Sequence, residues 1–137
     1  MTTDLWTLFD STKPWTANAE RTWHHYKRAA EVKACRTRFY YLARQAEVPP
    51  LDRIVVIAQP FRKDRRSMPD VAACYPTVKA AIDGIVDAGV IPNDSPKHLI
   101  GLVFMTPEVI GTEGLCVRVA GPTHPIHDLF RNLADRA

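Results

Sequence analysis

Hydrophobic and polar positions recur with two different periods along the chain, and the changes of period divide it into elements. Apolar residues at three- and four-residue intervals predict one long helix at 23–45 and a shorter helix that begins near residue 76 and ends at residue 89. Alternating or continuous β-branched runs predict strands at 4–9, 53–58, 98–105 and 115–120. A last apolar stripe, at 126–133, predicts a short amphipathic C-terminal helix.

These elements follow one another in the order β-α-β-α-β-β-α over residues 1–137. In a chain of this length, such an order predicts a single α/β (α+β) domain in which helices pack against a mixed β-sheet. The connection between the last two strands, residues 106–114, contains Pro107 and two glycines, which is typical of a hairpin loop. We therefore expect these two strands to form a hairpin.

The long segment at 23–45 combines aromatic with basic residues, and two interpretations of it remain open. Basic side chains interleaved with residues such as Trp23, Tyr26 and Tyr41 can grip a DNA backbone and stack on exposed bases. A helix whose aromatics belong to the core and whose charges face water has the same composition. The apolar face predicted for this helix is imperfect and consists of Trp23, Tyr26, Ala30, Ala34, Phe39 and Leu42.

The second helix has two distinct faces. Pro76 suits its first turn, where a missing N–H costs nothing, and Gly89 suits the left-handed residue that ends a helix. Lys79, Asp83 and Asp87 lie four residues apart and share a face of their own. The apolar stripe lies on a different face and consists of Val78, Ile82, Ile85, Val86 and Val90.

Two acids stand in loop-like sequence on either side of this helix, Asp70 before it and Asp94 after it. Acids in both flanking loops can converge with Lys79 at one site, which makes these three residues the candidates for chemistry. Each also has an ordinary structural explanation, because Asp70 suits a helix cap, residues 92–96 suit a turn, and charged helix faces are common at surfaces. Spacing alone leaves both interpretations open.

Charge is unevenly distributed along the chain. Residues 1–69 hold thirteen Lys/Arg and seven Asp/Glu, whereas residues 70–137 hold five and eight. A nuclease would use the basic half to contact phosphates and the acidic half to hold a cation, although a solvated basic helix gives similar counts.

No apolar run approaches the ~20 residues that cross a bilayer, and the N-terminus has no basic leader. The three cysteines are widely spaced, which suits reduced thiols in a cytoplasm.

The most specific motif is the run Lys-Ala-x-x-Asp-Gly-x-x-Asp-Ala-Gly at 79–89, followed by Asp-Ser-Pro-Lys-His at 94–98. This motif resembles the core of the RusA-type Holliday junction resolvases, the crossover junction endodeoxyribonucleases of phages and prophages, in the form seen in phages of actinobacteria. The resemblance is strong over residues 62–101 and weak toward both ends. The matching residues are Arg66, Asp70, Tyr75, Pro76, Thr77, Lys79, Ala80, Ala81, Asp83, Gly84, Asp87, Ala88, Gly89, Asn93 and Asp94.

The resemblance implies a catalytic site with a metal. In the pattern of the family, Asp70 and Asp94 are the ligands of a divalent cation, Mg²⁺ or Mn²⁺, and Lys79 is the catalytic lysine that positions water or stabilises phosphate charge. Asp83 matches an acid on the same helix and is expected to support Lys79. A carboxylate-bound cation suits phosphodiester hydrolysis, because it activates water and neutralises the charge of the pentacovalent phosphate.

The resemblance also implies a DNA-contacting loop and an assembly. The basic residues after the third element, Arg62, Lys63, Arg65 and Arg66, would lie beside the catalytic carboxylates. Asn18 would neighbour the site in a Pro-rich loop, unless it simply starts the following helix. The expected partner is branched DNA, a four-way junction, bound by a homodimer in the cytoplasm of a bacterial host. The long helix and the first strand are the expected interface elements.

The chain departs from the family pattern at one place. Better-known members carry a second Asp two residues after the first, followed directly by Asn, whereas Ala72 and Ala73 stand here, and three extra residues separate the acid from the lysine. Asp64 and Asp87 are the two acids that could take the place of the missing carboxylate. A separate pair, His124 and His127, has spacing that suits a metal but no evident third ligand.

Three function classes therefore follow. The leading one is a metal-dependent, structure-selective endodeoxyribonuclease that resolves four-way junctions in phage DNA recombination or repair. The second is a junction-binding protein of the same fold with little or no cleavage, which the two alanines suggest. The third is a phage adapter that binds a host protein, suggested by small size and aromatic residues.

Overall fold

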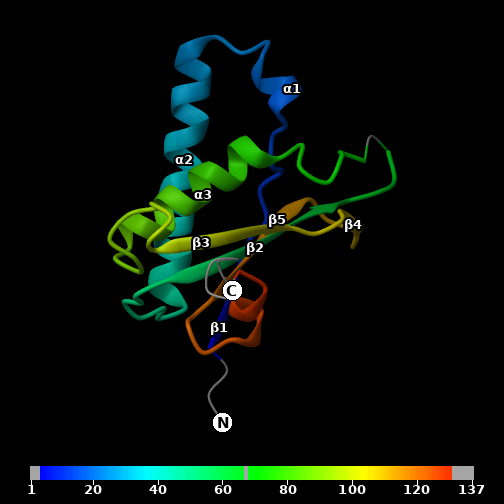
Figure 1. The fold of residues 1–137 in the computed structure, drawn as a ribbon. Helices are drawn as coiled ribbons and strands as arrows, with labels where there is room; N and C mark the ends of the chain where they lie inside the picture. The colour runs from blue at the N-terminus through cyan, green and yellow to red at the C-terminus, as the bar shows by residue number, and fades with distance from the viewer. Residues whose placement is uncertain (1–3, 67, 131–137) are drawn as a thin grey trace.

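A mixed five-stranded sheet forms the centre of the molecule, and helices pack against it (Figure 1). The computed structural model describes residues 4–66 and 68–130. The chain is a single small α+β domain, as expected from the alternation of its elements. The strands are β1 (Leu5–Asp10), β2 (Ile54–Arg62), β3 (Leu99–Phe104), β4 (Glu108–Val109) and β5 (Gly114–Ala120). The helices are α1 (Ala17–Glu20), α2 (His25–Gln45), α3 (Tyr75–Asp87) and the 3₁₀ turn η1 (Pro125–Phe130).

The strand order is β1-β5-β2-β3, with the short β4 also paired to β2. Strand β5 runs antiparallel to both β1 and β2, whereas β3 runs parallel to β2. The predicted hairpin between the last two strands is therefore wrong, because β3 and β5 lie on opposite sides of β2. Strand β2 is buried along most of its length, so its backbone needs a hydrogen-bonded strand on each side. The connection from β3 to β5 therefore passes the end of β2, where its residues 108–109 pair with β2 as β4.

The core lies between the sheet and the two long helices. Val56 and Ala58 of β2 and Val117 of β5 are fully buried and face α2 and α3. The predicted stripe of α3 is confirmed, since Val78, Ile82, Ile85 and Val90 are buried and Val86 packs against them at the margin. Gly89 has φ of +86°, which confirms the left-handed end of the helix.

The apolar face of α2 differs from the predicted one. Phe39 is buried and Leu42 partly buried, as expected, but Tyr26 is 74 % exposed. The buried residues are Cys35, Phe39 and Ala43, which lie four apart and face α3 and the sheet. Tyr26 near the start of α2 therefore lies outside the core, whereas Trp23, just before the helix, packs partly buried against it.

Helices α2 and α3 approach each other closely at Gly84. A Cβ atom at this position would overlap the carbonyl oxygen of Arg36 and lie 3.0 Å from the backbone nitrogen of Tyr40. Only glycine leaves room for the two backbones at this distance. Because α3 also carries Lys79, this contact fixes the candidate site relative to the rest of the domain.

Some element boundaries differ from the expectation. Strand β2 continues to Arg62, past the predicted end at residue 58. Helix α2 begins at His25, because the His24 side chain caps it by accepting from the Tyr26 N–H. Residues 125–130 form a 3₁₀ turn where the C-terminal helix was expected, and the rest of that prediction lies outside the described residues. Within the described ranges, no helix has the length and apolar character needed to cross a membrane.

Candidate active site

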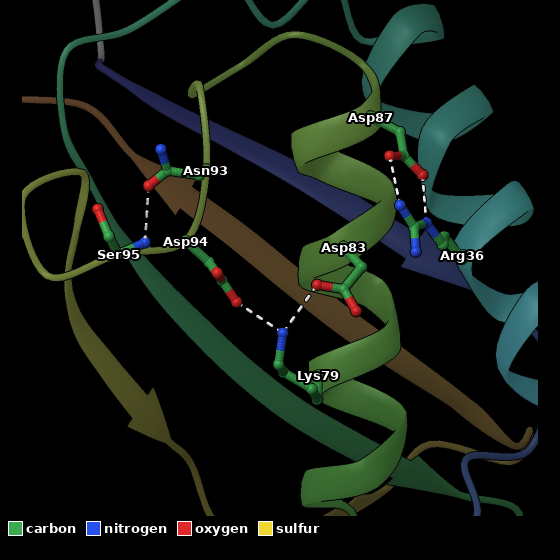
Figure 2. A network of polar contacts seen from close by, with 7 residues as sticks. All are labelled: Arg36, Lys79, Asp83, Asp87, Asn93, Asp94 and Ser95. Atoms are coloured by element: carbon green, nitrogen blue, oxygen red, sulfur yellow. Dashed lines mark hydrogen bonds and ion pairs between the residues drawn. The ribbon is translucent and has the colours of Figure 1, made fainter.

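Lys79 lies between two carboxylates that come from different segments (Figure 2). Its Nζ donates to Asp83 Oδ1 at 2.8 Å, one turn further along α3, and to Asp94 Oδ2 at 2.6 Å, in the loop after the helix. That loop is shaped by an Asx turn in which the Ser95 N–H donates to Asn93 Oδ1 at 3.0 Å. The structure thus brings three of the sequence-predicted site residues into one cluster.

The electrostatics of the cluster favour the charged forms of Lys79 and Asp94. Partial burial lowers the pKa of Lys79, but the hydrogen bonds that Lys79 donates to Asp83 and Asp94 outweigh it, so the pKa is raised overall. The hydrogen bond from Lys79 lowers the pKa of Asp94. Lys79 is therefore an ammonium group at neutral pH, and it can donate hydrogen bonds and supply positive charge but cannot accept a proton.

Asp70 lies in the turn that leads into α3 and is exposed. Its carbonyl oxygen accepts from the Ala73 N–H at 3.0 Å, and its carboxylate forms no hydrogen bond or ion pair with any described residue. It does not cap α3, because the cap residue is Cys74, and no side-chain cap hydrogen bond is formed there. Among the residues that the structure describes, none therefore competes with a ligand for the Asp70 carboxylate.

Neither proposed substitute acid joins the cluster. Asp87 turns toward α2, where Arg36 Nη2 donates to Asp87 Oδ1 at 2.7 Å and Arg36 Nε contacts the other oxygen (Figure 2). Asp64 accepts from the backbone N–H of Arg66 at 2.9 Å in the basic loop. Over the described ranges, no group of three or more His, Cys, Asp or Glu is arranged to hold a metal ion.

The histidine pair does not form a metal site in the described part of the chain. His124 Nδ1 accepts from the Ile126 N–H at 3.0 Å, and His127 Nε2 lies 2.9 Å from the carbonyl oxygen of Ala120. These contacts hold the 3₁₀ turn η1 against the end of β5. The spacing of His124 and His127, which suggested metal ligands, is explained by these two local hydrogen bonds.

The Arg36–Asp87 pair fastens α3 to α2 and should give a modest, pH-dependent contribution. The hydrogen bond from Arg36 lowers the pKa of Asp87, so the stabilisation is present above the ordinary aspartate pKa of about 3.9 and is lost as the pH falls through the lower folded value. Both side chains are more than one-third exposed, which limits the effect. Asp87→Asn is expected to lower the free energy of unfolding by about 0.5 kcal/mol at pH 7. Urea titrations at pH 7 and pH 3 measure it.

At pH 3 the stability difference between the wild type and Asp87→Asn should be smaller than at pH 7, because pH 3 lies below the ordinary aspartate pKa of about 3.9 and part of the linked stabilisation is then lost. Asp52→Asn is the matched control, since Asp52 pairs with its neighbour Arg53 on an exposed loop and fastens no second helix. A stability difference at pH 3 as large as the one at pH 7 would show that Asp87 acts through packing and not through its charge.

The four basic residues at and after the end of β2 are not equivalent. The Arg62 side chain is only 10 % exposed and its Nε lies 2.9 Å from Glu113 Oε2. Lys63, Arg65 and Arg66 are exposed. Arg62 is the last residue of β2, and its side chain is largely buried in the domain, so its expected contact with DNA stays a prediction.

Asn18 occupies the single-turn helix α1 and is exposed. It does not start the following helix, because Thr16 caps α1 and α2 begins separately at His25. The backbone N–H of Ala17 donates to the carbonyl oxygen of Ala73 at 3.0 Å, which holds α1 against the turn that contains Asp70. The segment of Asn18 therefore adjoins the segment of Asp70, and a role of Asn18 itself in the site stays a prediction.

Sequence reasoning missed the anchor that positions this N-terminal segment. Thr77, buried in the first turn of α3, accepts from the Trp15 N–H at 2.8 Å and donates to the Trp15 carbonyl oxygen at 2.9 Å. The two bonds tie residues 62 positions apart. A threonine on the buried side of an apolar helix was the available signal, since a buried hydroxyl requires a partner.

The three cysteines offer no nucleophile. All are free thiols and all are buried. Burial raises the pKa of Cys35 to about 12 and that of Cys74 to about 11. The reactive form of a cysteine is the thiolate, so these residues contribute packing and not chemistry.

Comparisons with known proteins assign no class beyond the α+β domain already described. No family model matches the chain, and no curated protein sequence matches it either. Fold and site geometry are consequently the basis on which a function can be argued.

Proposed function

We propose that the protein is a metal-dependent, structure-selective endodeoxyribonuclease that cleaves four-way DNA junctions, of the RusA type. The observation that carries the proposal is the contact between Lys79 and Asp94. These residues lie 15 positions apart in the sequence, Lys79 on α3 and Asp94 in the loop that follows the helix. A lysine held by a loop acid, with a second accessible acid at the other end of the same helix, is the arrangement that the resemblance implies.

Lys79 would act on the phosphate. Because the ammonium group is fixed by Asp83 and Asp94, it is already oriented when substrate arrives, and orientation in advance makes an electrostatic contribution larger. Its side chain is 43 % exposed, so a phosphate oxygen can reach it. We assign to Lys79 the stabilisation of negative charge on the phosphate, and to Asp83 the positioning of Lys79.

Asp70 and Asp94 are the proposed ligands of Mg²⁺ or Mn²⁺. Their chemistry fits such an ion, since Mg²⁺ is often held by one or two carboxylates and completes its shell with water and substrate oxygens. Asp70 has both oxygens available, and Asp94 uses one oxygen for Lys79. When bound, the cation would lower the pKa of a bound water and neutralise charge on the phosphate.

The exposed residues Lys63, Arg65 and Arg66 are proposed to contact backbone phosphates near the cleavage site. Each phosphate contact releases counterions, so its loss lowers the slope of log affinity against log salt by about one unit. Arg65→Ala combined with Arg66→Ala is therefore expected to lower the slope by about two units and to weaken junction binding at low salt. Fluorescence anisotropy of a labelled junction at several salt concentrations measures both.

Lys33→Ala combined with Arg44→Ala is the matched control, because these exposed cations lie on α2 outside this loop. An unchanged affinity and slope in the Arg65→Ala, Arg66→Ala variant would place the DNA-binding surface elsewhere.

The biological setting follows from the same proposal. The protein would act in the cytoplasm of a bacterial host as a phage or prophage product in DNA recombination or repair. We further propose a homodimer, since a four-way junction presents two equivalent strands that a two-fold enzyme cuts symmetrically. Strand β1 lies at one edge of the sheet and is an element through which two copies could pair. Light scattering with and without junction DNA measures the assembly.

The direct test is cleavage of an end-labelled four-way junction in Mg²⁺, with a linear duplex of the same arm sequence as control. The proposal expects cleavage of the junction, no cleavage of the duplex, and no reaction in the presence of a chelator. Equal cleavage of junction and duplex would contradict selectivity for junctions. Absence of salt-sensitive DNA binding would favour a protein partner.

One observation favours a second candidate, a junction-binding protein with weak or no cleavage. Ala72 is exposed where better-known family members carry an acid, and no third acid replaces it in the described chain. Ala72→Asp discriminates the two, because it restores the missing carboxylate on an exposed turn without disturbing the core. A large gain in cleavage rate would mark the natural protein as a weakened enzyme.

A further inference from the structure

A cavity of about 470 Å³ opens between the N-terminal segment, the start of α2 and the end of β2. We propose that it binds one unstacked nucleotide of branched DNA, with the base against the partly exposed indole ring of Trp23, which packs beside the buried Trp15, and with the phosphate beside Lys13 and Lys27. This inference rests on the proposed function, since it supplies the way in which the enzyme recognises a branch point.

The aromatic side of the cavity is built from two tryptophans. Their ring centroids lie 5.7 Å apart with the planes inclined by 41°. Trp15 is held rigidly, because its backbone is bonded to Thr77 and its indole Nε1–H donates to Glu20 Oε2 at 2.9 Å. Trp23 is only partly buried and offers an accessible ring. Every base has a face that stacks on such rings, so this recognition does not depend on sequence.

The polar side of the cavity is mainly cationic. Lys13, Lys27 and Arg62 line it, and Glu31 is the acid among the lining residues. Lys13 and Lys27 are exposed, whereas Arg62 is held in place at the end of β2 by Glu113. A ligand that carries both an aromatic ring and a negative charge matches this combination, and a nucleotide is such a ligand.

Lys27 also sets a requirement for entry. Its Nζ lies 4.9 Å from the centroid of the Trp23 ring, so a base that stacks on this face must displace it. Loss of an exposed cation–π contact costs less free energy than stacking of a base contributes, so the exchange is favourable. The displaced ammonium group remains near the cavity, where it can meet the phosphate.

Size and position agree with a single nucleotide at a branch. The volume falls in the range of small-ligand pockets, roughly 300–1,000 Å³, and is too small for a duplex. Pro69 forms part of the wall and directly precedes Asp70, and Ala17 joins α1 to the turn that contains Asp70. A base at a branch point is cheaper to unstack than one within a duplex, which would make the cavity selective for junctions.

The experiment uses the full chain and deoxyadenosine 5′-monophosphate as the probe. In a ¹H–¹⁵N spectrum, the indole N–H signals of Trp15 and Trp23 are expected to shift on titration, whereas that of Trp6 on β1 stays unchanged as an internal control. Inorganic phosphate alone should shift them much less. Trp23→Leu is expected to weaken binding about tenfold or more, and the matched variant Tyr41→Leu, an exposed aromatic further along α2, should bind like wild type.

Lys27→Ala provides a second variant that leaves the packing of Trp23 in place, with Lys33→Ala as its control on the same helix. The inference is overturned if neither indole signal moves, if phosphate acts as strongly as the nucleotide, or if Trp23→Leu and Lys27→Ala bind as well as wild type. This readout needs no cleavage. Nucleotide binding by a protein that never cuts junctions would refute the nuclease and leave the cavity assignment intact. Junction cleavage without indole shifts would support the nuclease and refute the cavity assignment.

Discussion

Lys79→Ala is expected to slow junction cleavage by roughly 100-fold or more while junction affinity changes little. The ammonium group is held by Asp83 and Asp94 at fixed positions, and we propose that its charge acts mainly on the phosphate as negative charge develops. Groups that act in this way typically contribute ~10²–10⁴ in rate. A loss confined to the rate of the bound complex, with unchanged affinity, is the signature of an interaction made mainly in the transition state.

Single-turnover cleavage of a labelled junction, at protein concentrations above the dissociation constant, separates the rate from binding. Lys97→Ala is the matched control, because Lys97 is exposed in the loop just beyond Asp94 and joins no cluster. Lys79 is permanently protonated near neutral pH, so the wild-type rate should show no titration from this residue between pH 6 and 9. An affinity loss that accounts for the whole defect would make Lys79 a binding residue.

Gly84→Ala is expected to destabilise the domain strongly, by about 3 kcal/mol. The added Cβ would meet the backbone of α2 at Arg36 and Tyr40, and backbone atoms cannot move aside as a flexible side chain would. The helices must then separate, which loosens the packing around Phe39 and displaces α3 together with Lys79. For a domain of this size, the melting temperature should fall by roughly 10 °C.

Gly89→Ala is the control for Gly84→Ala. Position 89 has φ of +86° but no atom within 4 Å of an added Cβ, so substitution adds only backbone strain of about 1 kcal/mol. Thermal melts of the two variants should therefore differ clearly, with Gly84→Ala much the less stable. A melting temperature for Gly84→Ala equal to that of wild type would show that the helix crossing is looser than described.

Much of the fold could be predicted because its elements carry strong local signals. The stripe of α3 from Val78 to Val90, its left-handed end at Gly89 and the β-branched run of β2 each specify an element by themselves. The order of strands in the sheet could not be predicted, because Pro107 and two glycines suit a crossing connection as well as a hairpin. Pairing partners depend on which strand is most buried, and that is a property of the whole domain.

Part of the candidate site could be predicted from local spacing, and the part that depends on contacts between distant segments could not. Lys79 and Asp83 are one helical turn apart, so their contact follows from spacing, and Asp94 follows from its place directly after the helix. The burial of Arg62 and the pairing of Asp87 with Arg36 depend on where β2 ends and on how α2 crosses α3. Such contacts between distant segments leave no periodic signal in the sequence.

The central claim is tested most directly by mapping the cuts that the protein makes in a four-way junction in Mg²⁺. The wild type is compared with the site variants Asp94→Asn and Asp70→Asn. Asp64→Asn, which changes an acid in the basic loop, is the control. The wild type and the control should make paired, symmetric cuts, whereas both site variants should bind the junction and leave it intact. The account is contradicted if the wild type binds junctions but never cuts them with Mg²⁺ or Mn²⁺, or if Asp94→Asn cuts as fast as the wild type.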